Sequence, residues 1–129
     1  MKKFVFFTLF FFLLFGISYA KDYKVKKKAG EYEVEIKIDK NPPIVGINRI
    51  EIEIKDATKN YDTDAKVEVE YSMPAMPGMP PMNYKTDAEL KGNEYRASMN
   101  LSMAGPWNIA IKITRGGKTT TTKFSIDAR

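Results

Sequence analysis

Apolar and polar residues alternate along most of this chain after residue 30. Between residues 48 and 55, for example, the apolar residues are Ile50, Ile52 and Ile54, with Glu51 and Glu53 between them. A period of two puts one face of a strand on a core and the other in water, which is typical of antiparallel sheets. The alternation predicts strands over residues 31–39, 48–55, 65–73, 84–90, 94–101, 107–113 and 120–126.

Turn signals separate these segments. They include Lys91-Gly92-Asn93, Gly105-Pro106 and Arg115-Gly116-Gly117-Lys118, the last of which predicts a two-residue hairpin. Residues 23–29 are expected to add an edge strand whose lysines discourage pairing with other chains. The sequence therefore predicts an all-β fold, an immunoglobulin-like antiparallel β-sandwich of about seven strands.

The first 20 residues have the order of a secretory signal. Lys2 and Lys3 precede an apolar run over residues 4–17, and Ser18-Tyr19-Ala20 offers small residues for cleavage after Ala20. The run is shorter than the ~20 residues that a membrane-spanning helix needs, so a retained anchor is the less favoured alternative. We expect residues 1–20 to be a signal peptide and residues 21–129 a single domain, periplasmic or otherwise exported.

The chain contains no cysteine and no histidine. Disulfides, thiolate nucleophiles and Ser-His-Asp triads are thereby excluded, and we expect no enzyme. The usual imidazole ligands of zinc and Cu(II) are missing too, so a metal site would use thioethers, carboxylates, tyrosine, amides or backbone groups. Charges alternate in sign along the strands, which argues against a nucleic-acid partner.

Residues 73–82 carry four methionines at a spacing of three, separated by prolines. Proline-rich segments favour polyproline II, which has three residues per turn and would put Met73, Met76, Met79 and Met82 on one face. Thioether sulfur is a soft ligand and suits Cu(I). Neighbouring methionines would stand about 9 Å apart along such a helix, so more than two could share an ion only with a bend at Gly78 or a contribution from Met103.

Two other interpretations of this segment stay open. Methionine fills irregular gaps, so the segment could plug one end of the sandwich, and methionine-rich surfaces also suit adaptable protein contacts. Leucine and valine would plug equally well and are absent between residues 73 and 82, which favours a role for sulfur. Met99 and Trp107 have the parity of core residues.

Several short motifs together resemble the YtkA-like domain, which is related to the FixH family. They are Gly30-x-Tyr32-x-Val34, Met73-Pro74-x-Met76, Gly92-x-x-Tyr95, Met103-x-Gly105-x-Trp107 and Phe124-Ser125-Ile126. The resemblance implies an exported or membrane-attached β-sandwich that serves copper handling, heavy-metal efflux or cytochrome oxidase assembly. Its partners would be proteins of those systems.

The leading hypothesis is a copper-binding or copper-delivery module. Its Cu(I) ligands would be Met76, Met79 and Met82, with Met73 and Met103 as additional candidates. The alternative is an interaction or structural domain of an efflux or respiratory-oxidase complex, in which the same segment contacts a protein and binds no metal.

Overall fold

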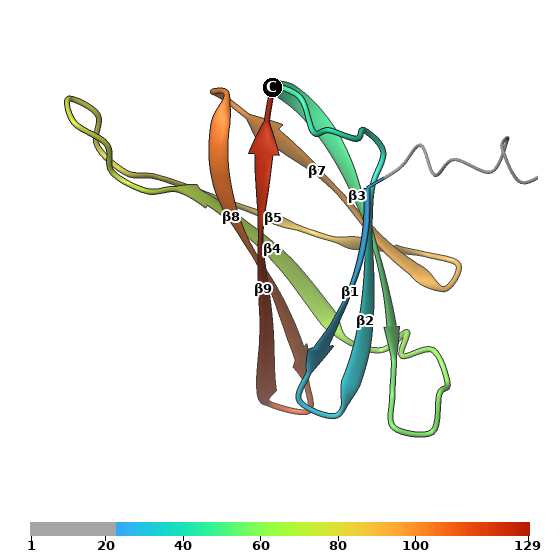
Figure 1. Cartoon of the computed structure of the whole chain (residues 1–129). Coiled ribbons are helices and arrows are strands. Elements are labelled where there is room, and N and C mark those ends of the chain that lie inside the picture. Colours follow the sequence, from blue (N-terminus) through green and yellow to red (C-terminus); the bar gives the residue numbers. More distant parts are fainter. Residues whose placement is uncertain (1–22) are drawn as a thin grey trace, which may run out of the picture.

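Two antiparallel sheets packed face to face form the domain (Figure 1). The computed structural model describes residues 23–129, so the expected signal peptide lies outside the described residues. One sheet has the strand order β1-β2-β3-β7-β6 and the other the order β5-β4-β8-β9. The strands are β1 (Tyr23–Ala29), β2 (Tyr32–Ile38), β3 (Gly46–Lys55), β4 (Lys66–Met73), β5 (Met82–Asp87), β6 (Glu89–Lys91), β7 (Glu94–Leu101), β8 (Gly105–Arg115) and β9 (Lys118–Ala128).

The core consists of most of the apolar residues that the alternation placed on the inner faces, although Tyr84 and Leu90, which share that parity, are each 41% exposed. Ile50, Ile52 and Ile54 of β3 are fully buried, and Trp107 at the start of β8 has no exposed surface. Met99 is also fully buried. The β-sandwich and the assignment of Trp107 and Met99 to its core are therefore confirmed. Burial of this apolar face is the main force that holds the two sheets together.

Residues 23–129 form nine strands, where about seven were expected. One addition is β1, which pairs with β2 along its whole length as the expected edge strand. The other arises because the segment 84–90 is not one strand. It bends at Ala88, whose N–H donates to the carbonyl of Val67 at 2.9 Å, so that β5 pairs with β4 in one sheet and β6 pairs with β7 in the other. The switch closes one side of the sandwich.

The hairpin predicted at residues 115–118 is confirmed. Arg115 and Lys118 are the last partners of the β8–β9 ladder, and Gly116 and Gly117 have φ angles of 59° and 78°. Positive φ at both central residues is what a type I′ turn requires.

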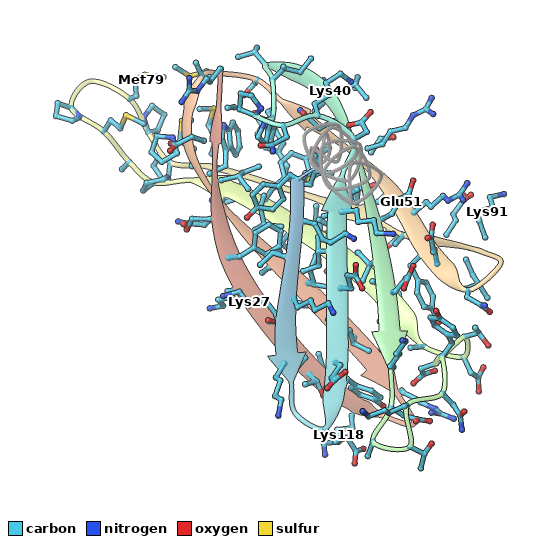
Figure 2. The ribbon with its side chains drawn as sticks, turned by 45° about the vertical axis from the view of Figure 1, so that its right-hand side comes forward. Lys27, Lys40, Glu51, Met79, Lys91 and Lys118 are labelled. Carbon is cyan, nitrogen blue, oxygen red and sulfur yellow. The ribbon has the colours of Figure 1, made fainter. Side chains whose placement is uncertain are left out.

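One end of the sandwich gathers several loops. The chain terminus is held there, because Arg129 donates to the carbonyl of Pro43 and accepts from the N–H of Val45. The connection between β7 and β8 lies at the same end. A hairpin of residues 74–81, called here the methionine arm, projects from this end beyond the body of the domain (Figures 1 and 2). Over residues 23–129, no helix has the length and apolar character needed to cross a membrane.

Candidate functional site

The methionine arm turns back on itself at Pro77 and Gly78. Met76 and Met79 exchange two backbone hydrogen bonds, with N···O distances of 3.1 and 2.8 Å. Gly78 has a φ of 81°, and proline followed by a residue of positive φ is the combination favoured by type II turns. The bend at Gly78, one of the conditions for a site with more than two sulfurs, is therefore present.

The four methionines form two cross-strand pairs. Met73 and Met82 are the last partners of the β4–β5 ladder, and Met76 faces Met79 near the tip. Polyproline II was the wrong expectation, because backbone pairing across the turn outweighs the proline tendency. Directly opposite residues of a hairpin share a face and have Cβ atoms about 5 Å apart, so the thioethers of Met76 and Met79 can reach a common ion.

The base of the arm brings a third strand connection into reach. Ser102 Oγ donates a hydrogen bond to Met82 Sδ at 3.6 Å, and Met103 follows Ser102 in the β7–β8 connection. The Met103 carbonyl accepts a hydrogen bond from Trp107 Nε1 at 3.0 Å, which fixes this connection against the core. Met103 therefore lies at the same end as the arm, which is the condition under which it could join the site.

The candidate ligands differ in exposure. Met73 is only 1% exposed, and its Cε would lie 3.3 Å from a Cβ on Gly105, so it is packed as a core residue. Met76, Met82 and Met103 are half-buried against the core. Met79 at the tip is 36% exposed (Figure 2). The arrangement combines a pair near the tip with two further sulfurs at the base.

Three aromatic rings support the base of the arm. The ring centroids of Tyr71 and Tyr84 are 5.4 Å apart, and those of Tyr71 and Trp107 are 6.1 Å apart. Tyr71 is anchored further because its hydroxyl accepts the N–H of Asn100 at 3.3 Å. Tyr84, in contrast, is 41% exposed although its parity points inward. Aromatic contacts of this kind contribute about 0.5–1.5 kcal/mol each to stability beyond the burial of their surface. The arm is therefore attached to a well-packed part of the sandwich.

The sequence holds a signal for this hairpin that the spacing of three conceals. Tyr71 pairs with Tyr84, Met73 with Met82 and Met76 with Met79, so each residue has a partner of its own type at the mirror position about Pro77–Gly78. Reading outward from a Pro-Gly dipeptide would have revealed this symmetry. The same pairing explains why residues three apart are not the ones that face each other.

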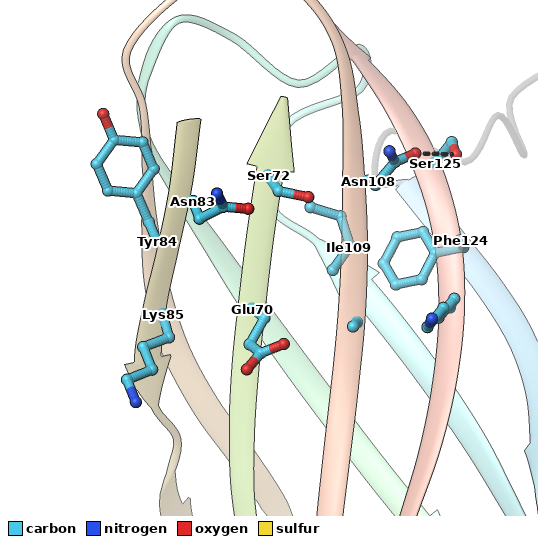
Figure 3. A pocket seen from close by; sticks show the side chains of 11 residues that line it. Glu70, Ser72, Asn83, Tyr84, Lys85, Asn108, Ile109, Phe124 and Ser125 are labelled. Carbon is cyan, nitrogen blue, oxygen red and sulfur yellow. Dashed lines mark hydrogen bonds between the residues drawn. The ribbon is translucent and has the colours of Figure 1, made fainter. Parts of the chain in front are cut away.

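The outer face of the β5-β4-β8-β9 sheet carries a second feature, a shallow hollow of 740 Å³ (Figure 3). A row of small polar residues crosses all four strands there, and Ser125 Oγ and Asn108 Oδ1 in it are 3.0 Å apart. Below this row, Glu70 forms an ion pair with Lys112 at 2.9 Å. The hollow contains no thioether and is separate from the methionine arm. In register order the polar row is Asn83, Ser72, Asn108 and Ser125.

Asp56 and Asp62, which lie in the β3–β4 connection, are both engaged in local contacts. Asp56 accepts hydrogen bonds from Thr58 and from the N–H of Asn60, and these bonds lower the pKa of Asp56. The buried Asp62 is paired with Arg115 at 3.1 Å. Among residues 23–129 there is no group of three or more His, Cys, Asp or Glu side chains that could hold a metal ion.

Comparison with known proteins places the chain in a family. No curated protein and no protein of solved structure matches it. A family model described as YtkA-like matches residues 22–112, which run from the start of β1 into β8 and include the methionine arm and the β7–β8 connection. Because the match spans more than half of the chain, the protein belongs to the YtkA-like family.

Proposed function

We propose that this protein is an exported, non-enzymatic module that binds Cu(I) through thioether sulfurs. Met76, Met79 and Met82 are the principal ligands, and Met103 and Met73 are secondary ones. The observation that carries the proposal is the pairing of Met76 with Met79 across the Pro77–Gly78 turn, because it brings two soft donors together on a preformed hairpin.

The donor set fits Cu(I) better than harder ions. The chain has neither thiolate nor imidazole to offer, and the methionines at 73, 76, 79, 82 and 103 gather at one end of the domain. A thioether has no proton to lose, so binding would not compete directly with protons as it does at cysteine and histidine sites. Met82 at the base supplies a third sulfur, and the half-buried Met103, which follows Ser102, is a further candidate.

The exposure of Met79 at the tip of the methionine arm favours a role in Cu(I) delivery over one in Cu(I) storage. Met79 projects from the body of the domain, where a partner with soft ligands could replace it without opening the core (Figure 2). Copper handling, heavy-metal efflux and cytochrome oxidase assembly are the settings that the family resemblance suggests. We therefore propose proteins of those systems as the recipients.

A competition titration tests the proposal. Residues 21–129 would be titrated with Cu(I) without oxygen, against a chromogenic Cu(I) chelator, beside a Met76/Met79/Met82→Leu variant. We expect the variant to lose at least about 100-fold in affinity, since two or more soft donors are removed. Met99→Leu is the matched control, because Met99 is buried in the core, and it should bind as the unaltered domain does. Equal affinity of the triple variant and the unaltered domain would refute the proposal.

A second candidate function is protein interaction without metal. Val45 and Ile47 are 43% and 51% exposed, and they lie at the same end as the arm, where Val45 contacts the chain terminus. Exposed aliphatic side chains at a loop-rich end favour a protein contact. If the domain shows no Cu(I) binding, an Ile47→Asp variant that keeps its fold but loses a partner in a pull-down would favour this function, whereas retention of the partner would count against it.

A further inference from the structure

The methionines of the described domain form a graded series of exposure. Met99 and Met73 are 0% and 1% exposed, Met76, Met82 and Met103 are half-buried, and Met79 is 36% exposed at the end of the arm. Because the chain has no cysteine, its thioethers are the side chains most readily oxidised by two-electron oxidants. The structure therefore sets an order in which such an oxidant can reach them.

The sulfur atoms also differ in their surroundings. Met82 Sδ already accepts a hydrogen bond from Ser102 Oγ, which engages one of its lone pairs. Met103 and Met76 pack against the core. Met79 has neither form of protection: residues 77–78 beside it form an open turn, and nothing lies within 4 Å of the position of a Cβ on Gly78.

We infer that Met79 is an oxidation site for peroxides, and that its conversion to the sulfoxide disables Cu(I) binding by the arm. The second half of this inference rests on the proposed function. The Met79 sulfur attacks one oxygen of hydrogen peroxide, an S–O bond forms and the O–O bond breaks. The sulfur loses two electrons, the other oxygen leaves as hydroxide, and hydroxide takes the remaining proton from the transferred oxygen to become water.

The product is no longer a soft ligand. A sulfoxide presents a hard, polar oxygen, and the one lone pair left on its sulfur is a much weaker donor to Cu(I), so Met76 would be left without its partner across the turn. Because sulfoxides are reduced enzymatically, the change is reversible. Oxidant would thus release copper from the arm without unfolding the domain, whose core methionines stay protected.

Two measurements on residues 21–129 test the inference. In the first, metal-free protein is treated with limiting hydrogen peroxide, and the added oxygen is located by mass spectrometry of peptides. We expect Met79 to react several-fold faster than Met82 or Met103, and at least about 10-fold faster than Met73 and Met99, as burial slows oxidation. Reaction of Met82 or Met103 at the rate of Met79 would overturn the inference.

In the second measurement, the singly oxidised protein is separated from peroxide and titrated with Cu(I) without oxygen. Its affinity should fall to that of a Met79→Leu variant, with circular dichroism unchanged. Unaltered affinity after oxidation of Met79 would overturn the inference even if the unoxidised domain binds Cu(I) tightly. Absence of binding by the unoxidised domain would instead refute the proposed function, and the order of oxidation would still be measured independently.

Discussion

Met76 and Met79 face each other across a two-residue turn, joined by two backbone hydrogen bonds of 3.1 and 2.8 Å. The pair places two thioethers on one face of a hairpin that continues from the β4–β5 ladder. The candidate site therefore depends on the geometry of the turn as well as on its sulfur atoms.

The turn provides the first prediction. Gly78 has a φ of 81°, which asparagine tolerates and a β-branched residue does not. Gly78→Val should open the hairpin and lower Cu(I) affinity about 10-fold or more, while Gly78→Asn should keep most of it. Both can be measured by the chelator competition described above. Similar affinities for the two variants would show that the turn does not organise the site.

The contact between Gly105 and Met73 provides the second prediction. The Cβ of an alanine at position 105 would lie 3.3 Å from Met73 Cε. That alanine would also have to adopt the backbone φ of 127° that Gly105 has. Gly105→Ala should lower the free energy of unfolding by about 1–3 kcal/mol, the cost of left-handed strain and a displaced side chain. Gly46→Ala is the control, because its φ is 106° but nothing lies within 4 Å. Chemical denaturation should show the larger loss for Gly105→Ala, and equal losses would mean that the Met73 contact costs nothing.

The acidic pair on the outer face of the first sheet provides a prediction about pH. A hydrogen bond to Glu94 and partial burial raise the pKa of Glu51, and the same hydrogen bond lowers the pKa of Glu94. A raised pKa in the folded state means that Glu51 stabilises the fold while protonated and that this contribution disappears as pH rises through its folded pKa. The lowered pKa of Glu94 has the opposite consequence. Ionised Glu94 stabilises the fold above its unfolded pKa, and this contribution is lost as pH falls through its folded pKa.

Glu51→Gln should mimic the protonated acid at every pH. We expect it to raise the free energy of unfolding at pH 7 by up to about 0.5 kcal/mol, the usual scale for a surface change, and to flatten the acidic part of the stability curve. Glu33→Gln is the control, because Glu33 pairs with Lys55 in the ladder and not with a carboxylate. Thermal denaturation between pH 4 and pH 8, the range of carboxylate titration, would check both, and a loss of stability at pH 7 for Glu51→Gln would contradict the assignment.

The single tryptophan provides a prediction for core stability and a probe of the site. Trp107 is fully buried, and its indole N–H is bound to the Met103 carbonyl. Trp107→Phe should lower the free energy of unfolding by about 1–3 kcal/mol because it leaves a void and an unpartnered carbonyl.

Because Trp107 lies beside the connection that carries Met103, Cu(I) binding that involves Met103 should change the indole fluorescence, and Met103→Leu should abolish that change. A fluorescence change that persists in Met103→Leu would argue against a role for Met103.

The sequence predicts most of the fold because burial on one face imposes alternation on nearly every strand. It does not reveal the bend at Ala88, since a strand that moves from one sheet to the other keeps the same alternation on both sides of the bend. Tyr84 has inward parity yet is exposed because it lies on an edge strand near the arm. The site residues could be proposed from soft-ligand chemistry. The proline content, however, favours polyproline II and does not predict the pairing of Met76 with Met79, which depends on the two backbone hydrogen bonds between them.

The coordination of Cu(I) itself is the most direct test of thioether binding by the methionine arm. X-ray absorption at the copper edge, on residues 21–129 loaded with one equivalent of Cu(I) without oxygen, reports which atoms bind the ion. We predict a first shell dominated by sulfur that is lost in the Met76/Met79/Met82→Leu variant and kept in Met99→Leu. A first shell of nitrogen and oxygen alone, or the same shell in the triple variant, would contradict thioether binding by the methionine arm.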